Sequence, residues 1–102
     1  MNNLSSSQRS YLRSQSHHLE PVVIIGKNGI TDGTFETIRR ALDARELIKI
    51  KFREYKDEKQ SLSHQIAEST DSDVVGMIGH TIILFRQNPD PEKQNIHLPD
   101  LK

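Results

Sequence analysis

The amino-acid sequence predicts a single α/β domain with the element order α-β-α-β-α-β-β and a mixed four-stranded sheet. Stretches with helical spacing precede the first three of four apolar runs that are typical of strands, at residues 22–25, 47–52, 73–78 and 81–86. Strands separated by helices are expected to be parallel. Only Gly79-His80 separates the last two runs, and this Gly-X pair predicts an antiparallel hairpin with a type II′ turn.

Length and composition limit the classes of protein that the chain can belong to. A chain of 102 residues can build one modest core. The absence of cysteine excludes disulfides, thiolate catalysis and Cys-based zinc sites. No apolar run approaches the roughly 20 residues of a membrane span, and the N-terminus lacks the features of a secretion signal. We therefore expect a monomer in the cytoplasm that makes no contact with a membrane.

The net charge of zero conceals an asymmetry along the chain. Residues 1–53 contain nine lysine and arginine residues against five acidic residues, a net charge of +4, and the remainder carries −4. The position of the basic residues in space is therefore more informative than the isoelectric point.

The first helix is predicted to begin at Ser5, which forms a capping box with Gln8 three residues later. Proline disfavours helical geometry in the residue before it, so Pro21 is expected to end this helix. Arg9 and Arg13 are four residues apart and share one helix face. Exposed helix faces are usually charged, so this face alone does not indicate a binding site.

A glycine-framed turn follows the first strand. Residues 22–25 are apolar at every position, which predicts a strand covered on both faces, as in the middle of a sheet. Residues 26–29 form a G-x-x-G turn, and its glycines allow close approach of the backbone to a ligand. Lys27 supplies a charge, Asn28 a donor and an acceptor, and the helix predicted to start at Thr31 supplies free N–H groups. This combination predicts an anion site.

The second strand has the clearest alternation in the chain. In residues 47–52, Ile48 and Ile50 are expected to face the core, whereas Lys49 and Lys51 face the other way. One face of this strand is therefore predicted to be hydrated and basic. The helix before it carries an Arg39-Arg40 pair off its apolar stripe.

The last part of the chain contains a third helix and a tail. Asp57 can cap a helix that ends near the polar run at residues 69–72. Residues 87–102 are polar and contain three prolines, which predicts a C-terminal tail outside the single domain at residues 1–86. The sequence leaves open whether the few apolar side chains of the tail pack on the domain.

The motifs of common enzymes are missing. The glycine spacing fits neither a dinucleotide-binding fingerprint nor a Walker loop. No histidine pair has the i, i+4 spacing of a helical metal site, and no serine lies in a nucleophile-elbow sequence. We therefore expect no enzyme, cofactor, metal or small-molecule substrate. A second G-x-x-G match at residues 76–79 carries no charge and lies in a predicted strand, so it is interpreted as part of the hairpin.

The first turn and the basic residues around it together predict a surface that binds a nucleic-acid backbone. KH domains clamp a nucleic-acid backbone with a G-x-x-G loop. The chain has only five aromatic residues, and some of them are needed for the core. This favours recognition of nucleic-acid shape and backbone over base-by-base reading. The residues predicted to contact the phosphates of this backbone are Gly26, Lys27, Asn28, Gly29, Arg9, Arg13, Lys49 and Lys51.

Four blocks of the sequence resemble the CRM domain in its stand-alone bacterial form, the YhbY-like proteins. They lie at residues 4–13, 21–31, 46–51 and 75–86, so that the resemblance extends from Leu4 to Arg86. It implies a fold similar to the C-terminal domain of bacterial translation initiation factor three. It also implies RNA binding and association with precursors of the large ribosomal subunit, with the G-x-x-G loop of the family at residues 26–29.

Three hypotheses follow from the sequence. The first is a non-catalytic protein that binds ribosomal RNA in large-subunit precursors and aids their assembly. The second is a protein-interaction module that reaches the ribosome through a protein partner. The third is a module that binds a nucleotide or small anion at the loop, which predicts stabilisation by nucleotide alone.

Overall fold

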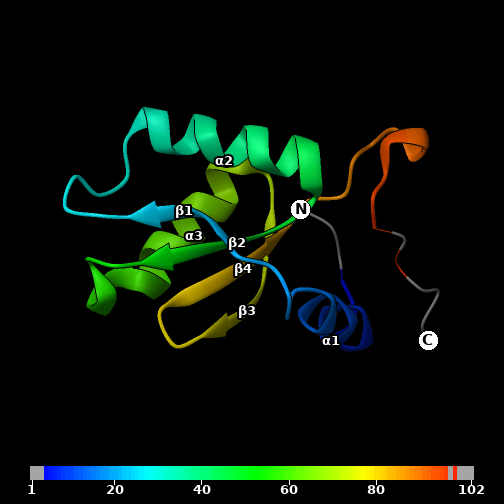
Figure 1. Ribbon diagram of the computed structural model, residues 1–102, viewed down its shortest axis with the longest axis horizontal. Coiled ribbons are helices and arrows are strands. Elements are labelled where there is room, and N and C mark those ends of the chain that lie inside the picture. The colour runs from blue at the N-terminus through cyan, green and yellow to red at the C-terminus, as the bar shows by residue number, and fades with distance from the viewer. Residues whose placement is uncertain (1–3, 97, 99–102) are drawn as a thin grey trace.

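The computed structural model describes residues 4–96 and 98, and the remainder of the predicted tail lies outside the described residues. The predicted element order is confirmed (Figure 1). The helices are α1 (Ser6–Gln15), α2 (Asp32–Arg45) and α3 (Lys59–Thr70), and the strands are β1 (Pro21–Ile25), β2 (Leu47–Phe52), β3 (Asp73–Ile78) and β4 (Thr81–Phe85). Two short 3-10 turns, η1 and η2, lie at Lys56–Glu58 and Pro91–Lys93. None of these described helices is long and apolar enough to cross a membrane.

The sheet has the strand order β1-β2-β4-β3 and is mixed, as predicted. The pair β1–β2 is parallel, whereas β4 runs antiparallel to both of its neighbours, β2 and β3. The turn between β3 and β4 contains Gly79 and His80, and Gly79 has a φ of +60°, as the first position of a type II′ turn requires. The chain therefore places β4 between two strands that precede it in the sequence.

The expectation that the first strand is covered on both faces is wrong. The strand β1 lies at the edge of the sheet, and the side chain of Ile24 is 48% exposed. Ile25 is buried because it faces the core on the side of α2. Ile24 is paired with Lys51 of β2 on the opposite face, where no helix covers this end of the sheet. A run of apolar residues therefore marks a strand here but does not reveal its place in the sheet.

Two apolar clusters hold the layers together (Figure 1). The helices α2 and α3 cover one face of the sheet, where Ile38, Ile50 and Phe52 belong to the larger cluster. The helix α1 packs on the other face, where Leu12 and Phe85 belong to the smaller cluster. The strand β4 contributes to both clusters and is buried on both faces.

The helix α1 has the predicted capping box but ends earlier than expected. The side chains and backbones of Ser5 and Gln8 exchange both hydrogen bonds. The helix ends at Gln15 instead of continuing to Pro21. Near its end, the hydroxyl of Ser14 donates to a backbone carbonyl 2.6 Å away, and that of Ser16 does so at 2.7 Å. Such side-chain bonds compete with helical hydrogen bonding and explain the early end.

The helix α3 also differs from the expectation at its N-terminus. It begins at Lys59, and Asp57 lies in the preceding 3-10 turn instead of capping the helix. The cap position is taken by Glu58, which makes no capping hydrogen bond through its side chain. The 3-10 turn η1 follows Tyr55, which lies three residues after the end of β2 and bends the chain with its left-handed backbone.

The segment that follows β4 is fastened to the domain by Glu46. This side chain is buried at the end of α2, and its carboxylate accepts backbone hydrogen bonds from Asn88, Asn95 and Ile96 at 2.5, 2.5 and 2.8 Å. Ile96 and Leu98 pack against the smaller apolar cluster. Of the apolar side chains that the sequence left open, these two therefore do pack on the domain.

Replacing Glu46 by glutamine is expected to loosen residues 88–96. The amide has one acceptor oxygen in place of two, so at least one buried N–H group loses its partner, at a cost of about 1–3 kcal/mol. Hydrogen exchange at the amides of Asn95 and Ile96 should become faster. The exposed Glu92 in η2 provides the control, since Glu92→Gln removes the same charge without a buried bond. Equal exchange rates in both variants would contradict this role of Glu46.

Candidate functional site

The G-x-x-G turn joins β1 to α2 and is closed by its own backbone. The N–H of Gly29 donates to the carbonyl of Gly26 at 3.0 Å, and Gly29 has a φ of +67°, which favours glycine. Lys27 and Asn28 lie between them with exposed side chains. The turn thus presents one cation and one amide to solvent from a fixed backbone.

The N-terminus of α2 contributes less to this turn than the sequence suggests. Thr31 and Thr34 form a capping box, which occupies two of the backbone N–H groups at the helix start. Asp32 adds a negative charge in the first helical turn. An anion at the loop would therefore depend chiefly on Lys27 and the loop backbone.

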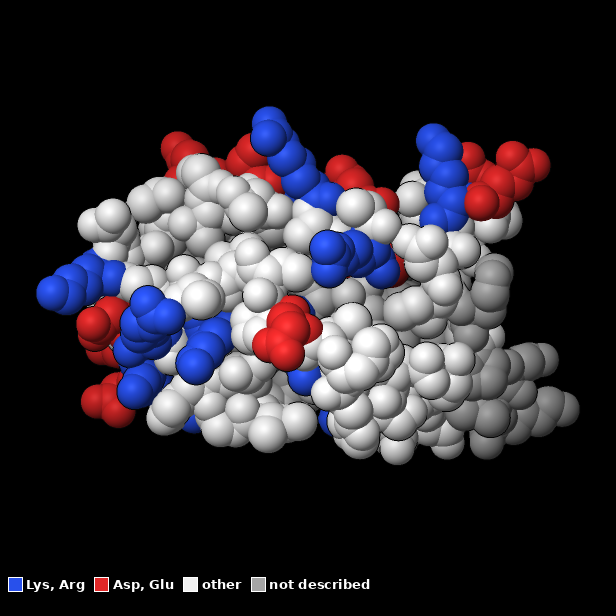
Figure 2. Space-filling model, in the orientation of Figure 1, with Lys and Arg blue, Asp and Glu red and all other residues white. Residues whose placement is uncertain are grey.

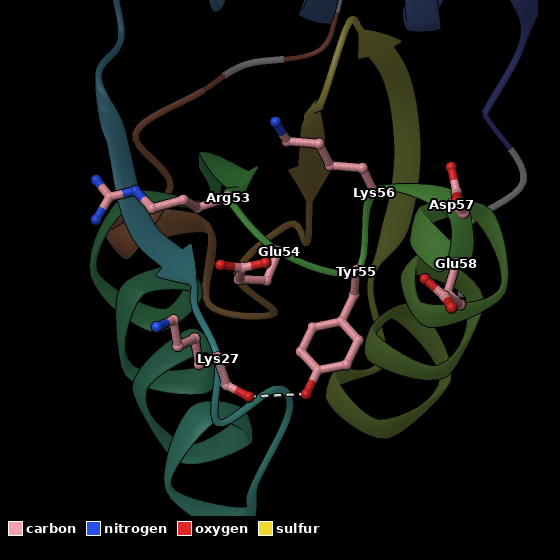
Figure 3. Close-up of a pocket in the computed structure, with 7 residues that line it drawn as sticks. All are labelled: Lys27, Arg53, Glu54, Tyr55, Lys56, Asp57 and Glu58. Carbon is pink, nitrogen blue, oxygen red and sulfur yellow. Dashed lines mark hydrogen bonds between the residues drawn. The ribbon is translucent and has the colours of Figure 1, made fainter.

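A groove of about 600 Å³ lies beside the turn (Figure 3). It forms because the parallel pairing of β1 and β2 places the C-terminal ends of both strands at the same end of the sheet. The backbone N–H groups of Arg53 and Glu54 both donate to the carbonyl of Ile25, at 3.0 and 3.1 Å. The groove is lined by three basic residues, three acidic residues and one tyrosine, namely Lys27, Arg53, Lys56, Glu54, Asp57, Glu58 and Tyr55.

Arg53 and Lys56 are not among the site residues predicted from the sequence. The signal for them was the predicted parallel pairing, since residues that follow two parallel strands lie side by side. Figure 2 shows lysine and arginine side chains gathered at the end of the molecule that carries the turn, with acidic side chains among them. The charge of the groove is therefore mixed.

The lysines of β2 lie on the face of the sheet opposite α2 and α3. Lys51 is exposed and is flanked by Ile24 of β1 and Thr81 of β4, whereas Lys49 is half-buried and is paired with Ile83. The predicted basic face of this strand is thus present. It begins next to the turn and continues toward α1.

Arg9 and Arg13 reach the same face from its other side. Their Nη1 atoms donate to the carbonyls of Val74 and Val75, at 2.8 and 2.9 Å. These carbonyls lie where a bulge interrupts the pairing of β3 with β4. Both arginines therefore hold α1 on the edge strand of the sheet. Each has further N–H groups besides the one that makes this bond.

The second G-x-x-G match has a structural explanation. A Cβ atom at Gly76 would lie 2.8 Å from Cδ of Arg13, so this glycine leaves room for the arginine to cross the strand. Gly79 forms the turn of the hairpin. Neither glycine belongs to the groove beside the first turn.

The structure brings five of the eight predicted residues together. Residues 26–29 and Lys51 lie at one end of the sheet, whereas Lys49 lies opposite Pro21 at the start of β1. Arg9 and Arg13 lie at the opposite edge of the α1 face. The pair Arg39-Arg40 does not join them. Both arginines belong to α2 on the other side of the sheet, where both form ion pairs with Glu36.

The side chains of His80 and Lys59 lie near Lys56 and Asp57 of the groove. Displacement of water and the charges of Lys59 and Lys56 lower the pKa of His80 from its ordinary value, and Asp57 opposes this shift. The Nζ atom of Lys59 lies 3.2 Å from Nδ1 of His80 and also donates a hydrogen bond to the carbonyl of Gly79. Within residues 4–96 and 98, no three acidic, histidine or cysteine side chains are grouped to hold a metal ion.

Comparison with known proteins identifies the family. Residues 4–86 match the CRS1/YhbY (CRM) domain. The chain belongs to this family. It is 36% identical over 91 residues to a protein of Pseudomonas aeruginosa named a probable RNA-binding protein, with 88% of each chain covered. It is also 38% identical over 100 residues to a protein of Haemophilus influenzae named an RNA-binding protein, with 97% and 98% of the two chains covered.

A solved structure of similar shape supports the CRM fold. The solution structure of a hypothetical protein from Staphylococcus aureus matches with a TM-score of 0.78 at 35% sequence identity. The match covers 94% of this chain and 99% of the other. The resemblance stated from the four sequence blocks is therefore confirmed, both for the CRM family and for the mixed α/β fold.

Proposed function

We propose that this CRM protein binds RNA without catalysing a reaction, and that it contacts chiefly the phosphate backbone. The observation that carries the proposal is the placement of Lys27, Lys51 and Arg53 at one end of the sheet, around a G-x-x-G turn with a fixed backbone. The names of the relatives from Pseudomonas aeruginosa and Haemophilus influenzae support the same partner. Cations on such a surface attract phosphates and release bound counterions, so affinity falls as salt rises.

The proposed contact surface runs from the turn across the α1 face of the sheet. It starts at Lys27, continues over Lys51 and Lys49, and ends at Arg13 and Arg9. Three strand spacings separate β1 from β3, a distance of about 14 Å. A stacked strand of roughly four nucleotides has this length. The surface therefore suits a short stretch of RNA backbone.

The proposed target is ribosomal RNA in precursors of the large ribosomal subunit, and the proposed role is to aid assembly. The support for this target is the resemblance to the stand-alone bacterial members of the family. We further propose that the protein acts as a monomer in the cytoplasm.

Binding to naked RNA separates this proposal from the alternative in which the ribosome is reached through a protein partner. The purified protein should bind protein-free, structured fragments of large-subunit ribosomal RNA in a filter or fluorescence assay. It should also co-sediment with large-subunit precursors. Co-sedimentation without any affinity for naked RNA would favour the protein-interaction alternative and reject direct RNA binding.

The acidic residues of the groove are expected to weaken RNA binding. Glu54 lies between Arg53 and Tyr55 in the lining of the groove, so its charge opposes that of the nearby cations. Glu54→Gln should raise RNA affinity about twofold at low salt, and the gain should vanish at about 1 M salt, where charges are screened within roughly 3 Å. Glu68→Gln on the exposed side of α3 is the control and should leave the affinity unchanged. A weaker complex with Glu54→Gln would contradict the phosphate-contact account.

A further inference from the structure

Tyr55 connects the end of β2 to the G-x-x-G turn, 28 residues earlier in the chain. Its hydroxyl donates a hydrogen bond of 2.7 Å to the backbone carbonyl of Lys27 (Figure 3). Lys27 is the one charged residue of the turn. The hydrogen bond fixes the peptide group between Lys27 and Asn28. The orientation of the Lys27 backbone thus depends on a residue outside the turn.

The ring of Tyr55 makes a second contact with the same turn. A Cβ atom at Gly29 would lie 3.3 Å from Cε2 and 3.4 Å from Cζ of the ring. Gly29 therefore packs closely against the ring. With the bond to Lys27, Tyr55 holds two of the four residues of the turn.

The backbone of Tyr55 is strained, and the strain is not compensated by deep burial of the ring. Its φ and ψ are 58° and 36°, in the left-handed region that residues with a side chain rarely adopt. The side chain is 42% exposed, so Tyr55 is not a core residue. Strained residues of this kind cluster at sites of function. Here the left-handed backbone aims the side chain at the turn.

We propose that Tyr55 is a positioning residue for RNA binding, which keeps Lys27 and the turn in the conformation that meets a phosphate. The inference rests on the proposed function. Tyr55 itself does not need to touch RNA for this role, because it acts through the two loop residues that it holds. Ordering the turn before RNA arrives removes part of the entropy cost of binding.

Two variants separate positioning from stability. Tyr55→Phe removes the bond to Lys27 and keeps the ring, and it should weaken RNA binding about threefold. Tyr55→Gly removes the ring and also the left-handed strain, so it should weaken binding about tenfold while the melting temperature stays equal or rises. In both variants the slope of log affinity against log salt should be unchanged, because every cation remains. Stability and affinity would then move in different directions, which a merely structural role does not produce.

The matched control is Tyr11→Phe, which removes the other tyrosine hydroxyl of the chain from α1 and should leave RNA affinity unchanged. Hydrogen exchange at the amides of residues 27–29 tests the inference without RNA. Exchange should accelerate in Tyr55→Phe and Tyr55→Gly and remain unchanged in Tyr11→Phe.

Two outcomes would overturn the inference. One is exchange in the turn that is unaffected by Tyr55→Gly, and the other is RNA affinity equal to that of wild type in both Tyr55 variants. A wild-type protein that ignores RNA while its turn loosens in the variants would instead reject the proposed function, so the two failures are distinguishable.

Discussion

Replacing Lys27 by glutamate is expected to weaken RNA binding about tenfold at low salt and to reduce the salt dependence of the affinity. Lys27 is the cation of the G-x-x-G turn, and its exposed side chain also lines the groove that contains Arg53 and Lys56. Charge reversal removes one phosphate contact and repels a second phosphate. The slope of log affinity against log salt should therefore fall by about one or more. A titration with structured ribosomal RNA at several salt concentrations measures both quantities.

The control for Lys27 is Lys93, which is exposed in η2. Lys93→Glu makes the same change in net charge and should shift the affinity by much less than Lys27→Glu. Equal affinities for wild type and Lys27→Glu, or a wild-type affinity independent of salt, would contradict the phosphate-contact account.

Truncating Leu12 to alanine is expected to lower the free energy of unfolding by about 2–5 kcal/mol, the cost typical for a fully buried leucine. Leu12 is the buried side chain of α1 and packs in the cluster that contains Ile83 and Phe85. The hydrogen bonds from Arg9 and Arg13 to β3, together with the packing of Tyr11, then remain to hold the helix on the sheet. Urea denaturation should show a lower midpoint with an unchanged m-value.

Leu12→Ala should also weaken RNA binding, because α1 carries Arg9 and Arg13 of the proposed contact surface. The control is Ile24→Ala, which truncates an aliphatic side chain that is 48% exposed and should cost less than about 0.5 kcal/mol. A Leu12→Ala protein as stable as Ile24→Ala would show that α1 is not held by this contact.

The elements that sequence reasoning predicted correctly are specified by neighbouring residues. The alternation of Ile48 and Ile50 with Lys49 gave the orientation of β2, because side chains in a strand alternate between faces. The Gly79-His80 pair gave the hairpin, and Thr31 gave the start of α2. Each of these signals lies within a few residues of the feature that it predicts.

The features that were missed depend on contacts between distant parts of the chain. The exposed edge position of β1 follows from the order of the whole sheet, which four apolar residues do not encode. Glu46 is buried because backbone N–H groups 42 to 50 residues later satisfy its carboxylate. Tyr55 reaches Lys27 across 28 residues. Such partners are known only once the tertiary fold is known.

The candidate site shows the same division. The G-x-x-G turn was evident from its residues, and the family resemblance placed RNA binding there. Arg53 and Lys56 join the groove because two parallel strands end at one edge. The anchoring of Arg13 across Gly76 required the position of α1 relative to β3. The residues of the turn could thus be predicted from the sequence, whereas the residues that the fold brings next to it could not.

Crosslinking of protein to RNA in living cells, followed by sequencing of the bound RNA, tests the proposed function most directly. We expect the wild-type protein to be enriched on a defined region of large-subunit ribosomal RNA, and the Lys27→Glu variant to lose most of this enrichment at equal expression. Wild-type crosslinks that are no more abundant than those of Lys27→Glu, or that are absent from ribosomal RNA, would contradict the proposed function.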